Sequence, residues 1–173
     1  MSAVSGGCRD NAGGGALVPL ACALPAWSYA GMSENKIDAA GWTRLSAPSL
    51  ADFENMAEAA FARLPEAFRN LCEGVIIRIE DFPDDDVVEE LEAESEFDIL
   101  GLFVGRGLAH RGAAAATGEM PNMVFLYRRP ILDYWAEHEE TLGHIVTHVI
   151  VHEIGHHFGL SDEDMERIEQ AAE

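Results

Sequence analysis

The chain has 173 residues, of which 48% are hydrophobic, and it carries a formal net charge of −20. This length and composition fit a folded domain with one hydrophobic core and exclude a disordered tail. Because the charge is strongly negative, it repels nucleic acid and anionic lipid, so neither is expected as a partner. No apolar stretch of about 18 residues or more occurs, so no membrane span is predicted.

Residues 1–31 differ in composition from the remainder of the chain. They are rich in glycine, two prolines interrupt their apolar run, and their only charges, Arg9 and Asp10, cancel. We predict that residues 1–31 are a disordered or spurious extension, and that residues 32–173 form a single domain. The alternative is an atypical signal peptide with an apolar region over Ala16–Ala26.

Cysteine usage indicates a reducing compartment. Cys8 and Cys22 lie in the extension, so Cys72 is the single cysteine of the predicted domain and cannot form an internal disulfide. We therefore predict a cytoplasmic protein, with secretion through the atypical N-terminal signal as the alternative. Cys72 follows a helical pattern beside Leu71, which favours a small buried hydrophobe over a nucleophile.

Periodicity and breaker residues predict an α+β fold in which a small twisted mixed sheet is backed by helices. The expected elements, in chain order, are a helix over 50–71 bent at Pro65, strand 75–80, helix 86–92, strand 97–104, loop 105–121, strand 123–128, helix 137–158 and helix 162–171. The loop is glycine-rich and longer than a plain connection, which is typical of a binding lip or lid.

An acidic run covers residues 84–98 and contains no basic residue. Such runs are commonly solvated surface, so we predict a short exposed helix capped by Asp84. Attraction of cationic peptides is the functional alternative.

The most informative stretch is the HExxH pattern that runs from His152 to His156. On a helix, residues four apart share a face, so these two imidazoles can bind one metal ion. Glu153 lies about 100° further round, where it can reach a metal-bound water without being a ligand. Gly159 allows the chain to turn back, which brings Asp162 toward the metal. Two nitrogens, one carboxylate and an open position are typical of a catalytic zinc site.

Asp162 also has a second interpretation as a first-turn acid of the last helix. Ser161 is a candidate N-cap with Asp164 three residues on, and acidic residues favour helix N-termini. We favour zinc ligation, because the six-residue step from His156 matches the third-ligand spacing of metzincins. The two roles are compatible.

Three further histidines accompany the motif. His144 and His148 precede His152 at four-residue steps, but each step drifts about 40° round the helix, so all four cannot face one ion. We interpret His144 and His148 as polar-face residues, with a second metal site as the alternative. His157 is expected either at the surface or in contact with one of the metal-binding side chains.

The string HEIGHHFGLSD resembles the metzincin pattern HExxHxxGxxH with Asp in place of the third His. It is more similar still to the small bacterial zincin-like metallopeptidases, whose minimal zincin fold carries HExxHHFGxxD before a short C-terminal helix. The resemblance runs from about Ser49 to the end. It implies zinc on His152, His156 and Asp162, with Glu153 as general base. It also implies a minimal zincin-like fold in which a long active-site helix precedes the short one.

Few residues follow Asp162, so there is no room for the Met-turn and lower subdomain of true metzincins, and Met165 is predicted to be a packing residue. The predicted function is a zinc-dependent metallopeptidase that hydrolyses peptide bonds of a peptide or protein substrate through a zinc-bound water activated by Glu153. By the resemblance, an extended substrate pairs with strand 123–128. The candidates for oxyanion stabilisation are Tyr127, Arg128 and His148.

Two other functions remain open at this point. A zinc-stabilised protein-binding module with little or no proteolytic turnover is favoured by the missing lower subdomain, whereas the intact Glu153 argues against it. A scaffold without metal is the third. The sequence predicts neither the substrate nor the oligomeric state.

Overall fold

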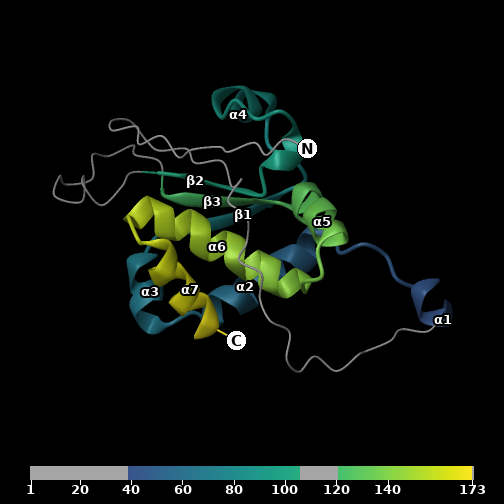
Figure 1. The fold of residues 1–173 in the computed structure, drawn as a ribbon, viewed down its shortest axis with the longest axis horizontal. Coiled ribbons are helices and arrows are strands. Elements are labelled where there is room, and N and C mark those ends of the chain that lie inside the picture. Colours follow the sequence, from purple (N-terminus) through teal and green to yellow (C-terminus); the bar gives the residue numbers. More distant parts are fainter. Residues whose placement is uncertain (1–38, 106–120, 173) are drawn as a thin grey trace, which may run out of the picture.

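The computed structural model describes residues 39–105 and 121–172. The predicted extension over 1–31 and nearly all of the predicted loop over 105–121 lie outside these residues. Within the described part, a small sheet lies against one side of the long helix α6 (Leu142–Phe158), and helices pack on the other sides of α6 (Figure 1). This is the α+β arrangement that the interleaved sequence pattern predicts.

The sheet is mixed and contains three described strands, β1 (Ile76–Glu80), β2 (Gly101–Val104) and β3 (Met123–Tyr127), in the order β1-β3-β2. Strand β1 runs parallel to β3, whereas β2 runs antiparallel to it. Each strand is a short run rich in β-branched or aromatic residues, as a strand partly buried against helices requires. The mixed sheet predicted from the sequence is therefore confirmed.

The first long helical pattern breaks where a bend was predicted. Helix α2 (Leu50–Arg63) begins with a capping box between Ser49 and Asp52, and α3 (Glu66–Leu71) follows it. Leu64 has extended backbone angles (φ −60°, ψ 147°). A residue before proline disfavours the helical region, so Pro65 separates two helices instead of bending one.

Two predicted boundaries are wrong. The helix expected over 137–158 is α6, which begins only at Leu142, and the helix before it, α5 (Arg128–Glu137), was not predicted. The hydroxyl of Thr141 caps α6 by accepting the backbone N–H of His144, and the polar segment between the helices has no apolar face to bury. Likewise, the strand expected over 97–104 begins at Gly101, because a capped 3₁₀ turn (Glu96–Asp98) occupies its start.

The remaining elements are short. Helix α1 (Ala39–Trp42) was not predicted, whereas α4 (Asp85–Glu90) and α7 (Asp162–Gln170) lie within two residues of their expected limits. No residue of α4 is buried, so the solvated acidic helix is confirmed. Asp84 stands at its N-cap, but the side chain makes no capping hydrogen bond there. In the described residues, no helix is long and apolar enough to cross a membrane.

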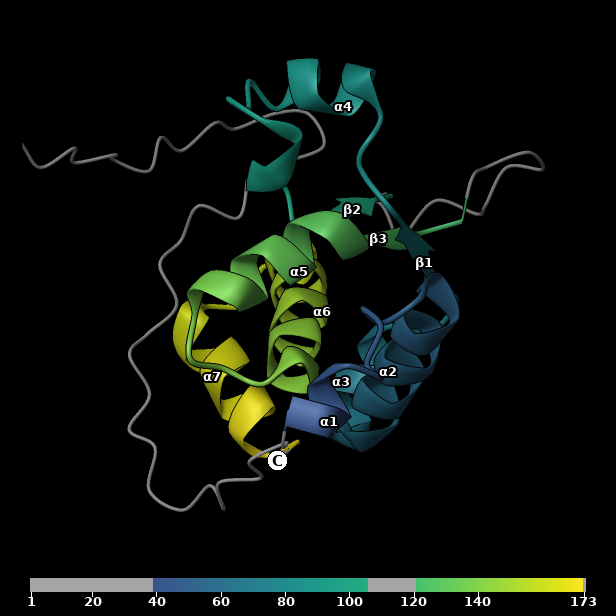
Figure 2. The same cartoon turned by 90° about the vertical axis from the view of Figure 1, so that its right-hand side faces the viewer.

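Helix α6 forms the centre of the main hydrophobic core. Figure 2 shows α6 with α2 and α7 on its two sides and the sheet above it, while α4 lies beyond the sheet. The helix is apolar around most of its circumference, which is the pattern of a helix enclosed by other elements. A second cluster occupies the opposite face of the sheet and contains Leu91, Ile99, Leu102 and Tyr127. Cys72 is buried, as predicted.

Candidate metal centre

The C-terminal end of α6 turns the chain back as the sequence predicts. Gly159 adopts a left-handed conformation (φ 72°), and the N–H of Leu160 donates to the carbonyl of Gly155 at 2.9 Å. This closing pattern is favoured by glycine, which has no Cβ to clash at positive φ. Ser161 then caps α7, with its hydroxyl accepting the N–H of Asp164. Asp162 therefore stands at the first turn of α7, next to the end of α6.

The three predicted ligands lie together. One ligand atom each from His152, His156 and Asp162 falls within 4.8 Å of the other two. The rings of the two histidines are 4.8 Å apart and nearly perpendicular, at 79°. Both histidines are partly exposed and Asp162 is exposed. Two imidazole nitrogens and a carboxylate, reachable from solvent, are the donor set that zinc takes in open sites.

Burial favours the neutral form of the His152 imidazole, which is the form that binds a metal ion. It lowers the pKa of this imidazole to about 4, and neighbouring His148 and His156 act in the same direction. The carboxylates of Glu169 and Asp162 oppose the shift. A histidine must be neutral to bind a metal ion, so this environment removes a competing proton at neutral pH.

Glu153 is one residue round the helix and faces the sheet. Its side chain is only 7% exposed, and Oε2 accepts the backbone N–H of Phe103 at 3.1 Å. Burial raises the pKa of this carboxyl to about 8, although the hydrogen bond from Phe103 opposes the effect. A carboxyl with a pKa near neutrality can both accept and release a proton, which is the requirement for acid–base catalysis.

Two glycines permit the close packing around these side chains. A Cβ on Gly101 of β2 would lie 2.6 Å from Val149 Cγ1 and 3.2 Å from Glu153 Cγ, so β2 approaches α6 only because this residue is glycine. A Cβ on Gly155 would lie 2.3 Å from Met165 Sδ. Met165 is 1% exposed, which confirms its predicted packing role.

The prediction that substrate pairs with strand 123–128 is wrong. Residues 123–127 form β3, which is the central strand and is paired on both sides, so no peptide can add to it. Among the described strands, β2 lies at the edge beside α6. The N–H of Tyr127 donates to Leu100, and in an antiparallel ladder alternate residues point outward, so Gly101 and Phe103 direct their N–H groups away from β3. The bond from Phe103 to Glu153 agrees with this direction.

The three candidate oxyanion donors are in different environments. Arg128 contacts Asp81 at 2.6 Å and donates to the carbonyl of Pro48 at 3.0 Å, and His148 pairs with Glu169. Tyr127 is 2% exposed, and burial raises the pKa of its phenol, with the charge of Glu153 among the lesser causes. Tyr127 nevertheless belongs to the second cluster, on the face of the sheet opposite α6, so its side chain does not point toward the predicted metal ligands.

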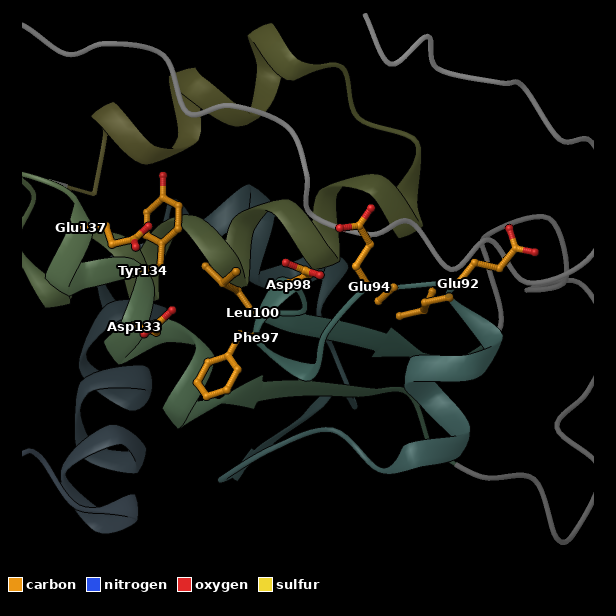
Figure 3. A pocket seen from close by; sticks show the side chains of 10 residues that line it. Glu92, Glu94, Phe97, Asp98, Leu100, Asp133, Tyr134 and Glu137 are labelled. Carbon is orange, nitrogen blue, oxygen red and sulfur yellow. The ribbon is translucent and has the colours of Figure 1, made fainter. Parts of the chain in front are cut away.

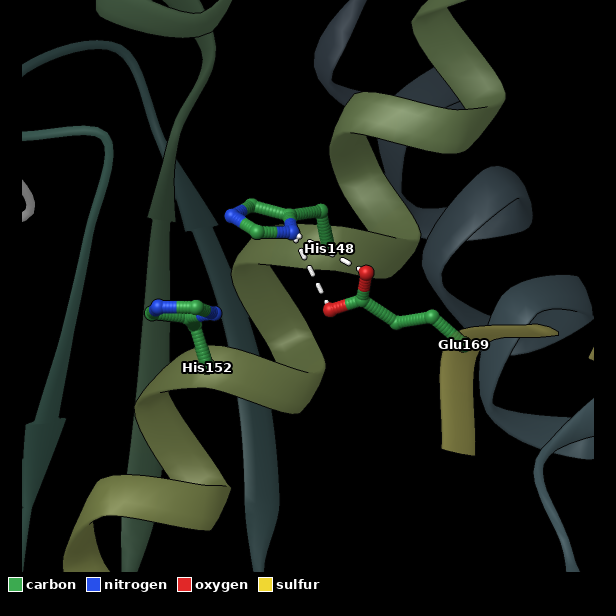
Figure 4. Close-up of side chains that lie close together, drawn as sticks. All are labelled: His148, His152 and Glu169. Atoms are coloured by element: carbon green, nitrogen blue, oxygen red, sulfur yellow. Dashed lines mark hydrogen bonds and ion pairs between the residues drawn. The ribbon is translucent and has the colours of Figure 1, made fainter. Parts of the chain in front are cut away.

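The other histidines do not form a polar face. His148 is 4% exposed, and its Nδ1 lies 3.0 Å from Oε1 and 3.2 Å from Oε2 of Glu169 (Figure 4). His144 contacts Glu140 through Nδ1 at 3.0 Å, and the ring of His157 stacks on Phe103. The polar-face prediction is therefore wrong for His148, because α7 covers that side of α6.

Sequence reasoning missed Glu169. It lies four residues after Met165 on α7, so both share one face of the helix, and Glu169 is only 5% exposed. A carboxylate four residues from an apolar packing residue was the available signal. The structure brings it to His148 and His152, and one ligand atom from each of the three lies within 4.8 Å of the others.

An acidic pocket of about 500 Å³ lies elsewhere, between α5 and the segment from α4 to β2 (Figure 3). Carboxylates dominate its wall, beside two aromatic rings; the lining acids and aromatics are Glu92, Glu94, Phe97, Asp98, Asp133, Tyr134 and Glu137. No residue of α6 lines it, so this pocket is separate from the ligand group.

Comparison with known families agrees with this geometry. Residues 72–172 match the family model described as zincin-like metallopeptidase. The match includes β1, the edge strand β2, helix α6 with its HExxH pattern, and the whole of α7. A comparison with curated proteins finds no match to the chain. The family model covers more than half of the sequence, and the chain therefore belongs to the zincin-like metallopeptidase family.

Proposed function

We propose that the protein is a zinc-dependent peptidase in which His152, His156 and Asp162 bind the ion and Glu153 is the general base. The observation that carries the proposal is that the C-terminal part of α6 and the start of α7 bring the three ligand side chains together, with Glu153 next to His152 in the chain. The ligand atoms of the first three residues approach one another, and the Glu153 carboxylate lies beside the edge strand β2. A zinc-dependent hydrolytic site needs both the metal and a base within reach of one peptide bond.

The side chains of the protein then have defined tasks. Zinc, when bound, supplies Lewis acidity that lowers the pKa of water and polarises the scissile carbonyl. Glu153 takes a proton from the attacking water and passes it to the departing amine. Burial raises the pKa of this carboxyl, which favours retention of the proton between the two transfers.

The substrate is expected to bind as an added strand on β2. The outward backbone groups of Gly101 and the carbonyl of Phe103 can pair with an extended peptide, and main-chain pairing would hold it beside Glu153. The close approach of β2 to α6 at Gly101 keeps this edge near the ligand group. Peptides and protein segments in extended conformation are therefore the proposed substrate class.

A zinc-stabilised binding module is the second candidate, and one observation favours it. Glu153 is buried and accepts the N–H of Phe103, so it also joins α6 to β2 and has a structural use without catalysis. The Glu153→Gln variant separates these roles. Glutamine retains an oxygen that can accept the N–H of Phe103, but it cannot act as a base.

The decisive experiment measures zinc content and peptide cleavage in the same preparations. The wild type should hold about one zinc ion per chain and cleave members of a broad peptide library. Glu153→Gln should keep the zinc and lose roughly 10² or more of the hydrolysis rate. The double variant His152→Ala/His156→Ala should lose the ion.

Three outcomes contradict the assignments. Zinc retained by the double variant rejects the ligands. Hydrolysis by Glu153→Gln at the wild-type rate rejects the base. A wild type that holds zinc and cleaves no peptide in the library supports the binding module.

A further inference from the structure

Glu169 is a buried carboxylate with an oxygen that accepts no hydrogen bond. Glu169 comes from α7 and approaches His148 with both oxygens, yet Oε1 has no hydrogen bond. Nδ1 of His152 is also buried and has no hydrogen-bond partner. The rings of His148 and His152 are 4.4 Å apart, and Figure 4 shows them on successive turns of α6, with the Glu169 carboxylate reaching His148. One ligand atom each from His148, His152 and Glu169 lies within 4.8 Å of the other two.

The spacing along α7 explains why this carboxylate lies there. Seven residues separate Asp162 from Glu169, which is close to two helical turns, so both side chains share a face. Met165 lies between them on that face and packs against Gly155 of α6. Because of this packing, the face of α7 that carries Asp162 at one end presents Glu169 at the other.

A metal-binding histidine normally donates its second ring N–H to a carboxylate, a carbonyl or a water, and this bond fixes the orientation of the ring. His152 requires such an acceptor, because its Nδ1 is enclosed by protein. A carboxylate has two oxygens and can accept from two imidazoles at once. Glu169 meets both conditions, since one oxygen can serve His148 while the other serves His152.

We propose that Glu169 is a positioning residue for the metal site: it accepts a hydrogen bond from Nδ1–H of His152, and His148 holds the carboxylate in place. This inference rests on the proposed zinc-binding role of His152. Helix α7 would then contribute to the metal site twice, with Asp162 as a ligand and Glu169 as the acceptor behind a ligand.

The test is zinc affinity, measured by competition with a chromophoric chelator. Glu169→Gln keeps the shape of the side chain but leaves one acceptor oxygen, so zinc should bind about 10- to 100-fold more weakly, with one ion per chain in both proteins. Glu140→Gln is the matched control, because Glu140 also contacts a histidine Nδ1 of α6, that of His144, at 3.0 Å. Its zinc affinity should equal that of the wild type.

Two results overturn the inference. If Glu169→Gln lowers only the melting temperature of the metal-free protein and binds zinc as the wild type does, Glu169 merely joins two helices. If the wild type binds two ions and Glu169→Gln binds one, Glu169 is itself a ligand, in the group that it forms with His148 and His152.

A measurement without substitution covers the case in which Glu169→Gln does not fold. In the zinc-loaded wild type, ¹⁵N-edited NMR should show a slowly exchanging Nδ1–H proton on His152, and its absence overturns the inference. Wild type that binds zinc with this Glu169 dependence but cleaves no peptide would refute only the peptidase function. Active wild type with an indifferent Glu169→Gln variant would refute only the positioning role, and a chain that binds no zinc refutes both.

Discussion

Replacing Glu153 by glutamine should stabilise the metal-free protein, and the gain should grow with pH. Burial raises the pKa of this carboxyl from 4.5 to about 8, so the folded protein holds a proton that the unfolded chain releases. The sign follows from this difference. The contribution of Glu153 to the free energy of unfolding is fully present below pH 4.5 and is lost progressively as the pH rises toward 8. Over this range the unfolded chain releases the proton of Glu153, whereas the folded protein still holds it. Glutamine is neutral throughout and escapes this loss.

The size of the effect follows from the two pKa values. Each pKa unit corresponds to about 1.4 kcal/mol, so the step from 4.5 to about 8 amounts to about 5 kcal/mol once ionisation is complete. At pH 7, ionisation of Glu153 in the unfolded chain has lowered the free energy of unfolding by about 3 kcal/mol. Glutamine introduces an amide group beside the N–H of Phe103, which adds a constant offset of about 1 kcal/mol. The dependence on pH, and not the absolute difference, is therefore the quantity to measure.

The assay is urea unfolding of the wild type and Glu153→Gln in the presence of a chelator, at several values between pH 5 and pH 8. The difference in unfolding free energy should increase by a few kcal/mol across this range. Glu58→Gln is the control, since Glu58 is exposed on α2, and it should follow the wild type. A difference between wild type and Glu153→Gln that is constant with pH would refute the reasoning about burial.

Three other changes test separate parts of the structure. Gly101→Ala should cost about 1–3 kcal/mol and reduce cleavage, because the added methyl would lie 2.6 Å from Val149 Cγ1; unchanged melting and activity would contradict the close packing of β2. Asp162→Asn should weaken zinc binding markedly, whereas a mere first-turn acid would lower stability by about 0.3–1 kcal/mol and leave the affinity unchanged. A protein that starts at Met32 should melt as the full chain does, and a large drop would show that residues 1–31 dock on the domain.

Local patterns predicted the part of the site that depends on helix geometry. The i, i+4 histidines, the glycine stop and the capped start of α7 are each fixed within a few residues, and the structure has all three. Boundaries were less accessible. The apolar periodicity of α6 extended the prediction back to residue 137, because polar residues such as those before Thr141 occur in helices and in connections alike.

The remaining errors concern partners that are distant in sequence. Nothing near residues 123–127 reveals that β3 is central, because strand order depends on β1 and β2 pairing from both sides. The same reason hid Glu169, which reaches His148 across 21 residues. Helix α7 carries several acidic residues, and the sequence does not show which of them lies on the face that packs against α6. The three proposed metal ligands could be predicted from sequence because His152, His156 and Asp162 lie within one helix and the turn that follows it, whereas Glu169, which we propose orients His152, reaches the site only through helix packing.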